Sequence, residues 1–267
     1  MKIGFIGLGN MASAMIGGII KNGVLAPEEI LGSSKTEASR KKAETQFGIC
    51  TMEDNISVAE QADVLVLSVK PQMYEEVVEQ IKGRVKKDAI IVSIAPGKTL
   101  DWLAGCFDIK KEESKLVRCM PNTPALVMEG CTGVCFSEAI TEEEKGQVLN
   151  IFQSFGKALV VPEQLMDTVV GVSGSAPAYV FLFIEALADG AVAEGMPRKQ
   201  AYEFAAQAVY GSAKMVLETG MHPAELKDMV CSPGGTTIEA VSVLEKTGFS
   251  SSIIEAERAC ISKSKQM

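Results

Sequence analysis

The chain has 267 residues, of which 47% are hydrophobic and 22% are charged, and its net charge is −8. This composition excludes an intrinsically disordered chain and leaves enough material for one large domain or two modest ones. The acidic balance argues against a nucleic acid as the main partner, so we expect none.

Cysteine and histidine content limits the metal chemistry. Seven cysteines are scattered without a paired framework, which is typical of a reducing compartment. His222 is the single histidine, so we expect no Cys/His zinc site and no metal. Cys131 and Cys135 lack metal-binding partners and are interpreted as core residues.

The uncharged stretch at residues 3–20 raises the question of export or membrane insertion. Glycines and polar residues interrupt it, and its strongly apolar part, residues 3–8, is short for a signal core of ~7–15 residues. We therefore predict a cytoplasmic protein that does not insert into a membrane.

The first ~160 residues alternate short β-rich runs with helical patterns, as in a parallel sheet with crossover helices. The expected strands are residues 2–6, 30–33, 49–52 (a weak one), 64–68, 90–94, 116–119, 132–136 and 158–161. The expected helices between them are residues 12–22, 37–47, 57–61, 74–85, 100–107 and 142–155.

Beyond residue 161 the pattern predicts helices alone. Their expected ranges are 162–170, 177–194, 197–219, 223–230, 238–246 and from about 251 to the end. We therefore predict an α/β fold in two parts. Residues 1–161 form a Rossmann-like, doubly wound, dinucleotide-binding domain, and residues 162–267 form an all-α domain for substrate binding and dimerisation. The helix at 177–194 is apolar nearly all round, so we expect it to be buried between subunits.

The first motif is Gly7-x-Gly9-x-x-Ala12, between a strand and a helix. Its glycines permit a tight turn and let a pyrophosphate approach the N–H groups of the helix. This context favours nucleotide binding over a merely structural turn.

The tip of the second strand bears on the choice of cofactor. NAD enzymes usually carry a carboxylate there, whereas this chain has Ser33, Ser34 and Lys35, with Arg40 soon after. Hydroxyls and a cation suit the 2′-phosphate of NADPH, so NADPH is the preferred cofactor and NADH a possible one. The alternative is that Lys35 is simply a solvated loop residue.

Three further loops follow predicted strands at the ligand-binding edge of the sheet. They are residues 68–71, 94–97 and 120–124, and the first two should border the ribose and nicotinamide. Each loop could instead reflect turn chemistry alone.

A second glycine loop, residues 232–235, opens the helix expected near residue 238. Thr236 and Glu239 fit a capping box, and free N–H groups at the helix start would hold a small anion such as one carboxylate. His222 before Pro223 is interpreted as a helix N-cap in preference to a catalytic residue.

These motifs resemble those of pyrroline-5-carboxylate reductases over essentially the whole chain. The specific segments are residues 119–124 (CMPNTP), 172–179 (VSGSAPAY) and 222–237, with the run SPGG at 232–235. The resemblance implies reduction of 1-pyrroline-5-carboxylate to L-proline by NAD(P)H, the last step of proline biosynthesis. It also implies a homodimer or a larger homo-oligomer whose interlocked helical domains share each active site.

The site residues follow from the motifs and the resemblance together. Thr237 is the expected catalytic residue and would support the proton at the ring nitrogen. The expected substrate-binding residues are Ser232, Gly234, Gly235, Thr236, Asp228 and Glu163. The expected cofactor-binding residues are Gly7, Leu8, Gly9, Asn10, Met11, Ser34, Lys35, Asn55, Val69, Lys70 and Ala95. Pro96 departs from the family, which commonly has alanine there.

Two other functions stay open at this point. A β-hydroxyacid dehydrogenase begins with a very similar glycine motif but needs a catalytic lysine on the long helix, and residues 178–193 contain none. A non-enzymatic NADP-binding sensor would keep the first glycine loop but would not need the second.

Overall fold

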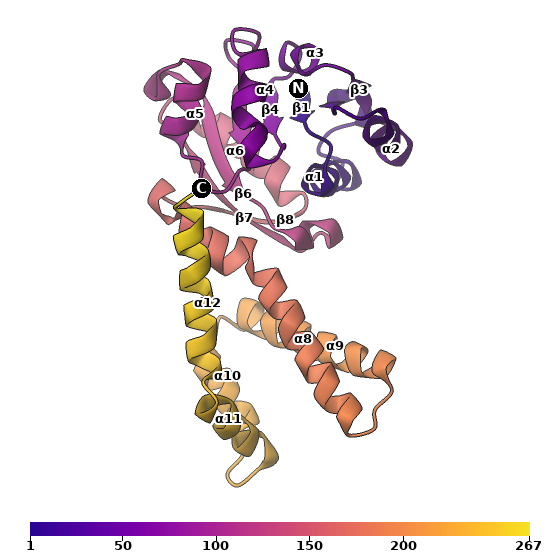
Figure 1. The fold of residues 1–267 in the computed structure, drawn as a ribbon, viewed down its shortest axis with the longest axis vertical. Coiled ribbons are helices and arrows are strands. Elements are labelled where there is room, and N and C mark those ends of the chain that lie inside the picture. Colours follow the sequence, from indigo (N-terminus) through magenta and orange to yellow (C-terminus); the bar gives the residue numbers. More distant parts are fainter. The chain divides into compact units, whose positions relative to one another are not determined.

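The computed structural model describes residues 1–267 and divides into two compact units (Figure 1). The first comprises Met1–Ser175 together with Cys260–Met267, and the second is Ala176–Ala259. The sequence placed the boundary after residue 161, directly after the last strand, whereas the first compact unit extends 14 residues further. The first unit continues to Ser175 because Met166 and Val170 are buried in one of its two hydrophobic clusters.

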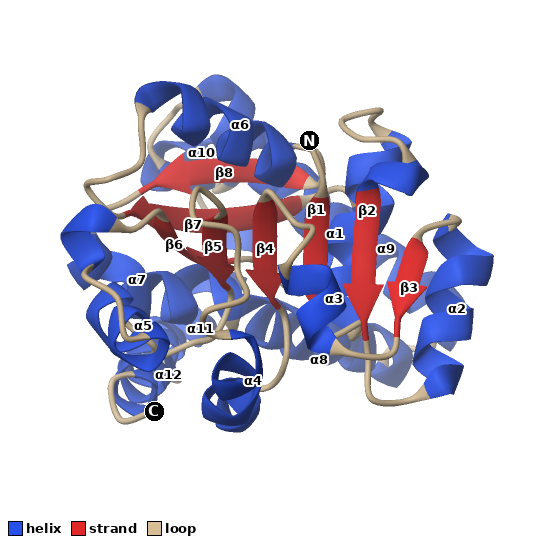
Figure 2. Cartoon of the chain, turned by 90° about the horizontal axis from the view of Figure 1, so that it is seen from above, coloured by secondary structure: helices blue, strands red, loops and turns tan.

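The first unit is built on an eight-stranded sheet with the order β3-β2-β1-β4-β5-β6-β7-β8 (Figure 2). All the expected strands are present, including the weak one near residue 50. Their bounds are β1 (Ile3–Ile6), β2 (Ile30–Ser33), β3 (Cys50–Met52), β4 (Val64–Leu67), β5 (Ile90–Ser93), β6 (Leu116–Met120), β7 (Gly130–Phe136) and β8 (Gly156–Val160). The order reverses between β1 and β4, which places the ligand-binding crevice at their carboxyl ends.

Strand β7 departs from the parallel arrangement that the sequence predicted. It pairs antiparallel with β6, with Val117 opposite Phe136, while β8 runs parallel to β7. The β6–β7 connection holds only the short 3-10 helix η4 (Thr123–Val127). A parallel return needs a crossover of a dozen or more residues, usually with a helix, so this short connection favours an antiparallel partner.

Helices cover both faces of the sheet, as in a doubly wound fold. Helices α1, α2 and α6 contribute to one hydrophobic cluster, and α3, α4, α5 and α7 to the other. Their bounds are α1 (Asn10–Lys21), α2 (Glu37–Phe47), α3 (Asn55–Ala59), α4 (Tyr74–Ile81), α5 (Leu100–Phe107), α6 (Glu142–Gln153) and α7 (Met166–Val169). Short helical turns complete the unit: η1 (Pro27–Glu29), η2 (Pro71–Met73), η3 (Lys111–Glu113), η5 (Glu163–Leu165) and the π-helical η6 (Val170–Gly174).

The second unit is entirely helical, as predicted. It contains α8 (Ala176–Ala193), α9 (Arg198–Thr219), α10 (Pro223–Val230), α11 (Thr236–Lys246) and most of α12 (Phe249–Ser264). Helices α8 and α9 pack side by side, joined at one end by an ion pair between Arg198 and Asp189. The expected cap at α10 is confirmed, because His222 Nδ1 accepts a hydrogen bond from the Ala224 N–H at 3.2 Å.

Large apolar side chains are exposed on this second unit. Phe181, Phe204 and Leu217 are 62%, 68% and 66% exposed, while only small residues such as Ala188 and Ala201 are buried. Apolar surface of this extent marks an interaction face. By length and composition alone, the helical stretch Glu163–Ala193 could also cross a membrane, although helices of soluble proteins pass the same test.

Candidate functional site

The turn from β1 into α1 needs its first glycine for two reasons. Gly7 has φ +99°, a conformation that disfavours any side chain, and a Cβ there would lie 2.8 Å from the Ser68 carbonyl oxygen. Its N–H donates to the Ser33 carbonyl at 2.9 Å, which joins the turn to β2. Gly7 thus draws the ends of β1, β2 and β4 together at the crevice.

Gly9 has a different role in the same turn. It is the N-cap of α1, with extended backbone at φ −79° and ψ −173°, and no side chain caps the helix. A Cβ on Gly9 would meet no atom within 4 Å. The backbone N–H groups of the first turn therefore face open space, which fits the close approach of a pyrophosphate.

A cavity of about 380 Å³ lies at the carboxyl ends of β1, β2 and β4. The expected cofactor residues that line it are Gly7, Leu8, Gly9, Ser34, Lys35, Asn55, Val69 and Lys70. Asn10 and Met11 lie in the first turn of α1, outside this lining, and Ala95 is buried after β5. Sequence reasoning did not single out Ser39, Met73 and Val77, which also line the cavity and carry no motif of their own.

Polar side chains at the tip of β2 form a connected group. The Ser33 hydroxyl donates to Asn55 Oδ1 at 2.8 Å, and Asn55 Nδ2 donates to Gln80 Oε1 at 2.8 Å. Arg40 donates to the Ser34 carbonyl at 2.8 Å and to Glu53 at 3.2 Å. These bonds place Ser34 beside a cation whose guanidinium is largely covered.

Lys35 stands further out at the same tip. Its ammonium lies 3.0 Å from a carboxylate oxygen of Glu76, and both side chains are more than half exposed. Such a surface pair contributes at most about 1 kcal/mol, so Lys35 can exchange this partner for a ligand phosphate at little cost.

The ends of β4 and β5 are joined by a buried tyrosine. The Tyr74 hydroxyl donates to the Leu67 carbonyl at 2.6 Å and accepts from the Ile94 N–H at 3.3 Å. Burial raises the pKa of Tyr74 well above its ordinary value, so it remains a neutral donor. The loops that follow the two strands, at the predicted cofactor edge, are therefore held together.

Asn122 in the CMPNTP segment serves the structure with its side-chain amide. It donates to the Ser173 carbonyl at 3.1 Å and accepts from the Cys131 N–H at 2.8 Å. It thereby ties β7 to the π-helical turn η6, and such turns occur frequently at functional sites. Of the two cysteines interpreted as core residues, Cys135 is buried, with its thiol pKa raised to about 12 by burial, while Cys131 is partly exposed.

The second glycine loop opens α11 in the second unit. Gly235 is the N-cap with φ −80° and ψ 170°, close to the conformation of Gly9, and no side chain caps the helix. The predicted capping box is therefore wrong, because Thr236 is the first helical residue and the N-cap has no side chain. The N–H groups at the start of α11 are left for a ligand or water.

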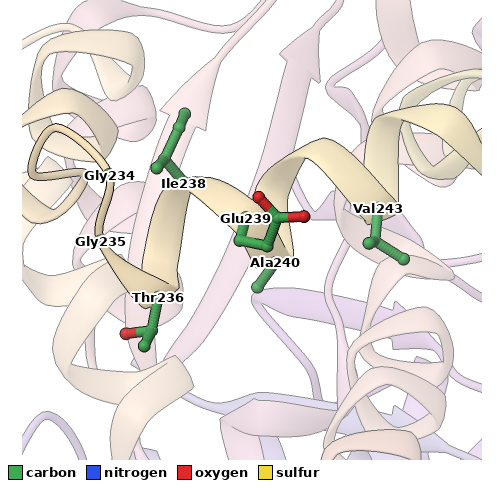
Figure 3. Close-up of a pocket in the computed structure, with 7 residues that line it drawn as sticks. All are labelled: Gly234, Gly235, Thr236, Ile238, Glu239, Ala240 and Val243. Carbon is green, nitrogen blue, oxygen red and sulfur yellow. The ribbon is translucent and has the colours of Figure 1, made fainter.

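The loop itself is tightly built. Gly234 has φ +66°, and a Cβ on Gly235 would clash with the Ser232 hydroxyl. The Gly235 N–H donates to the Ser232 carbonyl at 3.0 Å. An open cavity of about 560 Å³ lies beside the start of α11, drawn in Figure 3; its lining residues are Gly234, Gly235, Thr236, Ile238, Glu239, Ala240 and Val243. Thr237, the predicted catalytic residue, is half-buried and is not one of the residues that line this cavity.

Two expected substrate-binding residues, Asp228 and Glu163, do not line the cavity beside α11. Asp228 is exposed on α10, with the Lys227 ammonium 3.3 Å from its carboxylate. Glu163 belongs to the first unit, and its Oε1 accepts a hydrogen bond from the Leu100 N–H at 2.6 Å. In this chain Glu163 caps the start of α5.

Known proteins match this chain from end to end. A family model described as pyrroline-5-carboxylate reductase dimerisation matches residues 163–267, and one described as NADP oxidoreductase coenzyme F420-dependent matches residues 2–97. A pyrroline-5-carboxylate reductase of Escherichia coli is 52% identical over 266 residues, covering 100% of this chain and 98% of that protein. The chain belongs to the pyrroline-5-carboxylate reductase family.

More distant members agree with this assignment. The enzyme of Methanosarcina acetivorans is 44% identical over 100% of this chain and 97% of its own. The crystal structure of the Plasmodium falciparum reductase with NADP bound has a TM-score of 0.89 at 33% identity, covering 100% of this chain and 97% of that one. Family membership thus rests on both units, including the helical one that carries the second glycine loop.

Proposed function

We propose that this chain reduces 1-pyrroline-5-carboxylate to L-proline with NADPH as the preferred reductant. The observation that carries the proposal is the pair of uncapped helices that begin at glycine, α1 and α11. One provides N–H groups for a pyrophosphate, and the other provides them for a small anion such as the substrate carboxylate. The match to reductases of this name over the whole chain supports the substrate.

The residues present fit the cofactor. The space over Gly9 is open to a pyrophosphate, and Ser34, Lys35 and Arg40 offer hydroxyls and cations to a 2′-phosphate. Bound NADPH supplies the hydride that reduces the C=N carbon. Asn55, Val69 and Lys70 would hold the ribose and the adjoining part of the cofactor.

Apart from binding the cofactor, the reaction requires the protein mainly to bind and orient the substrate. A cyclic imine accepts hydride readily once its nitrogen is protonated, so the chain mainly has to orient the ring and hold its carboxylate. Ser232, Gly234 and Gly235 would bind that carboxylate, with Thr236 beside them. The Thr237 hydroxyl would support the proton at the ring nitrogen, directly or through water.

Assembly and location are part of the same proposal. The exposed apolar side chains of α8 and α9 would be covered in a homodimer, or in a larger homo-oligomer, rather than by a membrane. We place the enzyme in the cytoplasm, without nucleic acid or metal as a partner.

The test of this function is the loss of the nicotinamide absorbance. Purified protein with NADPH should oxidise the cofactor on addition of pyrroline-5-carboxylate and form proline. Turnover of the keto product of a 3-hydroxy acid instead would favour a β-hydroxyacid dehydrogenase. Binding of NADPH without turnover of either substrate would favour a sensor.

Replacing Thr237 with alanine should lower kcat/KM for pyrroline-5-carboxylate by about tenfold or more, the usual effect of losing one transition-state hydrogen bond. NADPH affinity should not change. The matched control is Thr247→Ala at the other end of α11, where the hydroxyl donates only to carbonyls of its own helix. Equal kinetics for the Thr237 variant and the wild type would remove this residue from the mechanism.

A further inference from the structure

Arg118 is a buried charge that the proposed reaction does not use. It lies on β6 and is 1% exposed. One guanidinium nitrogen, Nη2, donates to Asp167 Oδ1 at 3.1 Å, and Nη1 lies 3.9 Å from Glu163 Oε1. Its Nε is buried without a partner. A charge this deep requires partners, so the two carboxylates are held in place beside it.

Each carboxylate holds a further element. Glu163 accepts the N–H of Leu100, the first residue of α5, at 2.6 Å. Asp167 Oδ1 accepts the hydroxyl of Ser264, the last residue of α12, at 2.8 Å. Ser264 is 2% exposed, so its bond to this charged cluster is shielded from water.

Residues 264–267 contact the loop between β5 and α5, residues 94–99. A Cβ on Gly97 would lie 2.7 Å from the Met267 Cβ and 2.8 Å from the Ser264 carbonyl oxygen. The Lys98 ammonium donates to the Met267 carbonyl at 2.9 Å and lies 4.5 Å from the ring centre of Trp102. The chain end marked C in Figure 2 lies by α5. The loop is thus held at α5 by Glu163 and along its length by residues 264–267.

This loop borders the predicted nicotinamide half of the cofactor site. Strand β5 pairs with β4, with Ser93 opposite Leu67, and the residues after β4 line the cofactor cavity. In a doubly wound sheet the second half of a dinucleotide lies beyond the strands on that side of the switch point.

We propose that residues 264–267 form a strap that positions the β5–α5 loop for the nicotinamide end of NADPH, with the Arg118 cluster as its anchor. The proposal rests on the function proposed above. Ser264 is a positioning residue, because it acts through Asp167 and the loop rather than by touching the cofactor.

The test compares Ser264→Ala with Lys265→Ala, whose exposed side chain makes no bond in this structure. We measure the dissociation constants of NADPH and of adenosine 2′,5′-bisphosphate by fluorescence titration, and KM and kcat with pyrroline-5-carboxylate. Ser264→Ala should weaken NADPH by up to about tenfold, because the released loop must be ordered on binding and that cost is at most the worth of the lost bond to a charged group. It should leave the affinity for the bisphosphate unchanged. Ser264→Thr, which keeps the hydroxyl, should restore NADPH affinity.

If Ser264→Ala weakens NADPH and the bisphosphate by the same factor, the whole first unit has been loosened and the strap proposal is overturned. Unchanged NADPH affinity would overturn it as well. If Ser264→Ala fails to fold, Lys98→Met provides the same test, because it removes the bond to Met267 and keeps an aliphatic side chain over Trp102. The proposed function is judged separately by turnover of the wild type, so its failure is distinguishable from failure of the strap.

Discussion

Replacing Gly9 with valine should weaken NADPH binding by about 100-fold, or roughly 2.7 kcal/mol, and should lower the stability by only about 1 kcal/mol, because valine is a poorer N-cap than glycine. The backbone at Gly9 is extended, at φ −79° and ψ −173°, which valine adopts without strain. A Cβ there would meet no atom within 4 Å apart from its immediate chain neighbours, so no other segment has to move to make room for it. The added side chain would occupy the space where the pyrophosphate must approach the N–H groups of α1.

The matched control is Gly7→Ala in the same turn. There φ is +99°, and the new Cβ would lie 2.8 Å from the Ser68 carbonyl, so stability should fall by about 2 kcal/mol or more. Thermal unfolding and NADPH titration of both variants separate the two effects. NADPH affinity within threefold of the wild type for Gly9→Val would show that the phosphates do not lie over Gly9.

Replacing Arg118 with methionine should lower the free energy of unfolding by about 3–5 kcal/mol. Methionine is apolar and similar in length, so it fills much of the space. The Asp167 and Glu163 carboxylates would lose their buried cation, and the bonds to Ser264 and Leu100 would weaken. For a chain of this size the melting temperature should fall by roughly 10 °C.

Two further variants define what is lost at Arg118. Arg84→Met removes an exposed pair with Glu60 and should change the stability by less than about 1 kcal/mol. Arg118→Met combined with Asp167→Leu should recover part of the loss, because no unpaired carboxylate then remains at residue 167. A single Arg118→Met variant as stable as Arg84→Met would show that the cluster does not contribute to stability.

The predictable part of the candidate site is local in the sequence. Gly7 and Gly9 stand between a strand and a helix, and their effect depends on φ, ψ and neighbours a few residues away. The same applies to Gly234, Gly235 and the cap at His222, whose partner is two residues along the chain. The capping box at Thr236 was wrong because the helix begins one residue earlier than its pattern suggests.

The sequence by itself determined the α/β-then-α order, the eight strands, the two glycine loops and, through its motifs, the family. Hydrophobic periodicity, glycine conformation and short motifs are local, so they can be read directly. Only the tertiary structure decided the direction of β7, the capping role of Glu163 and the contact between Gly97 and residues 264–267. Each of these features brings together groups that are far apart in the chain. They meet because of how the elements pack and because a buried charge needs a partner, and no local sequence pattern encodes either.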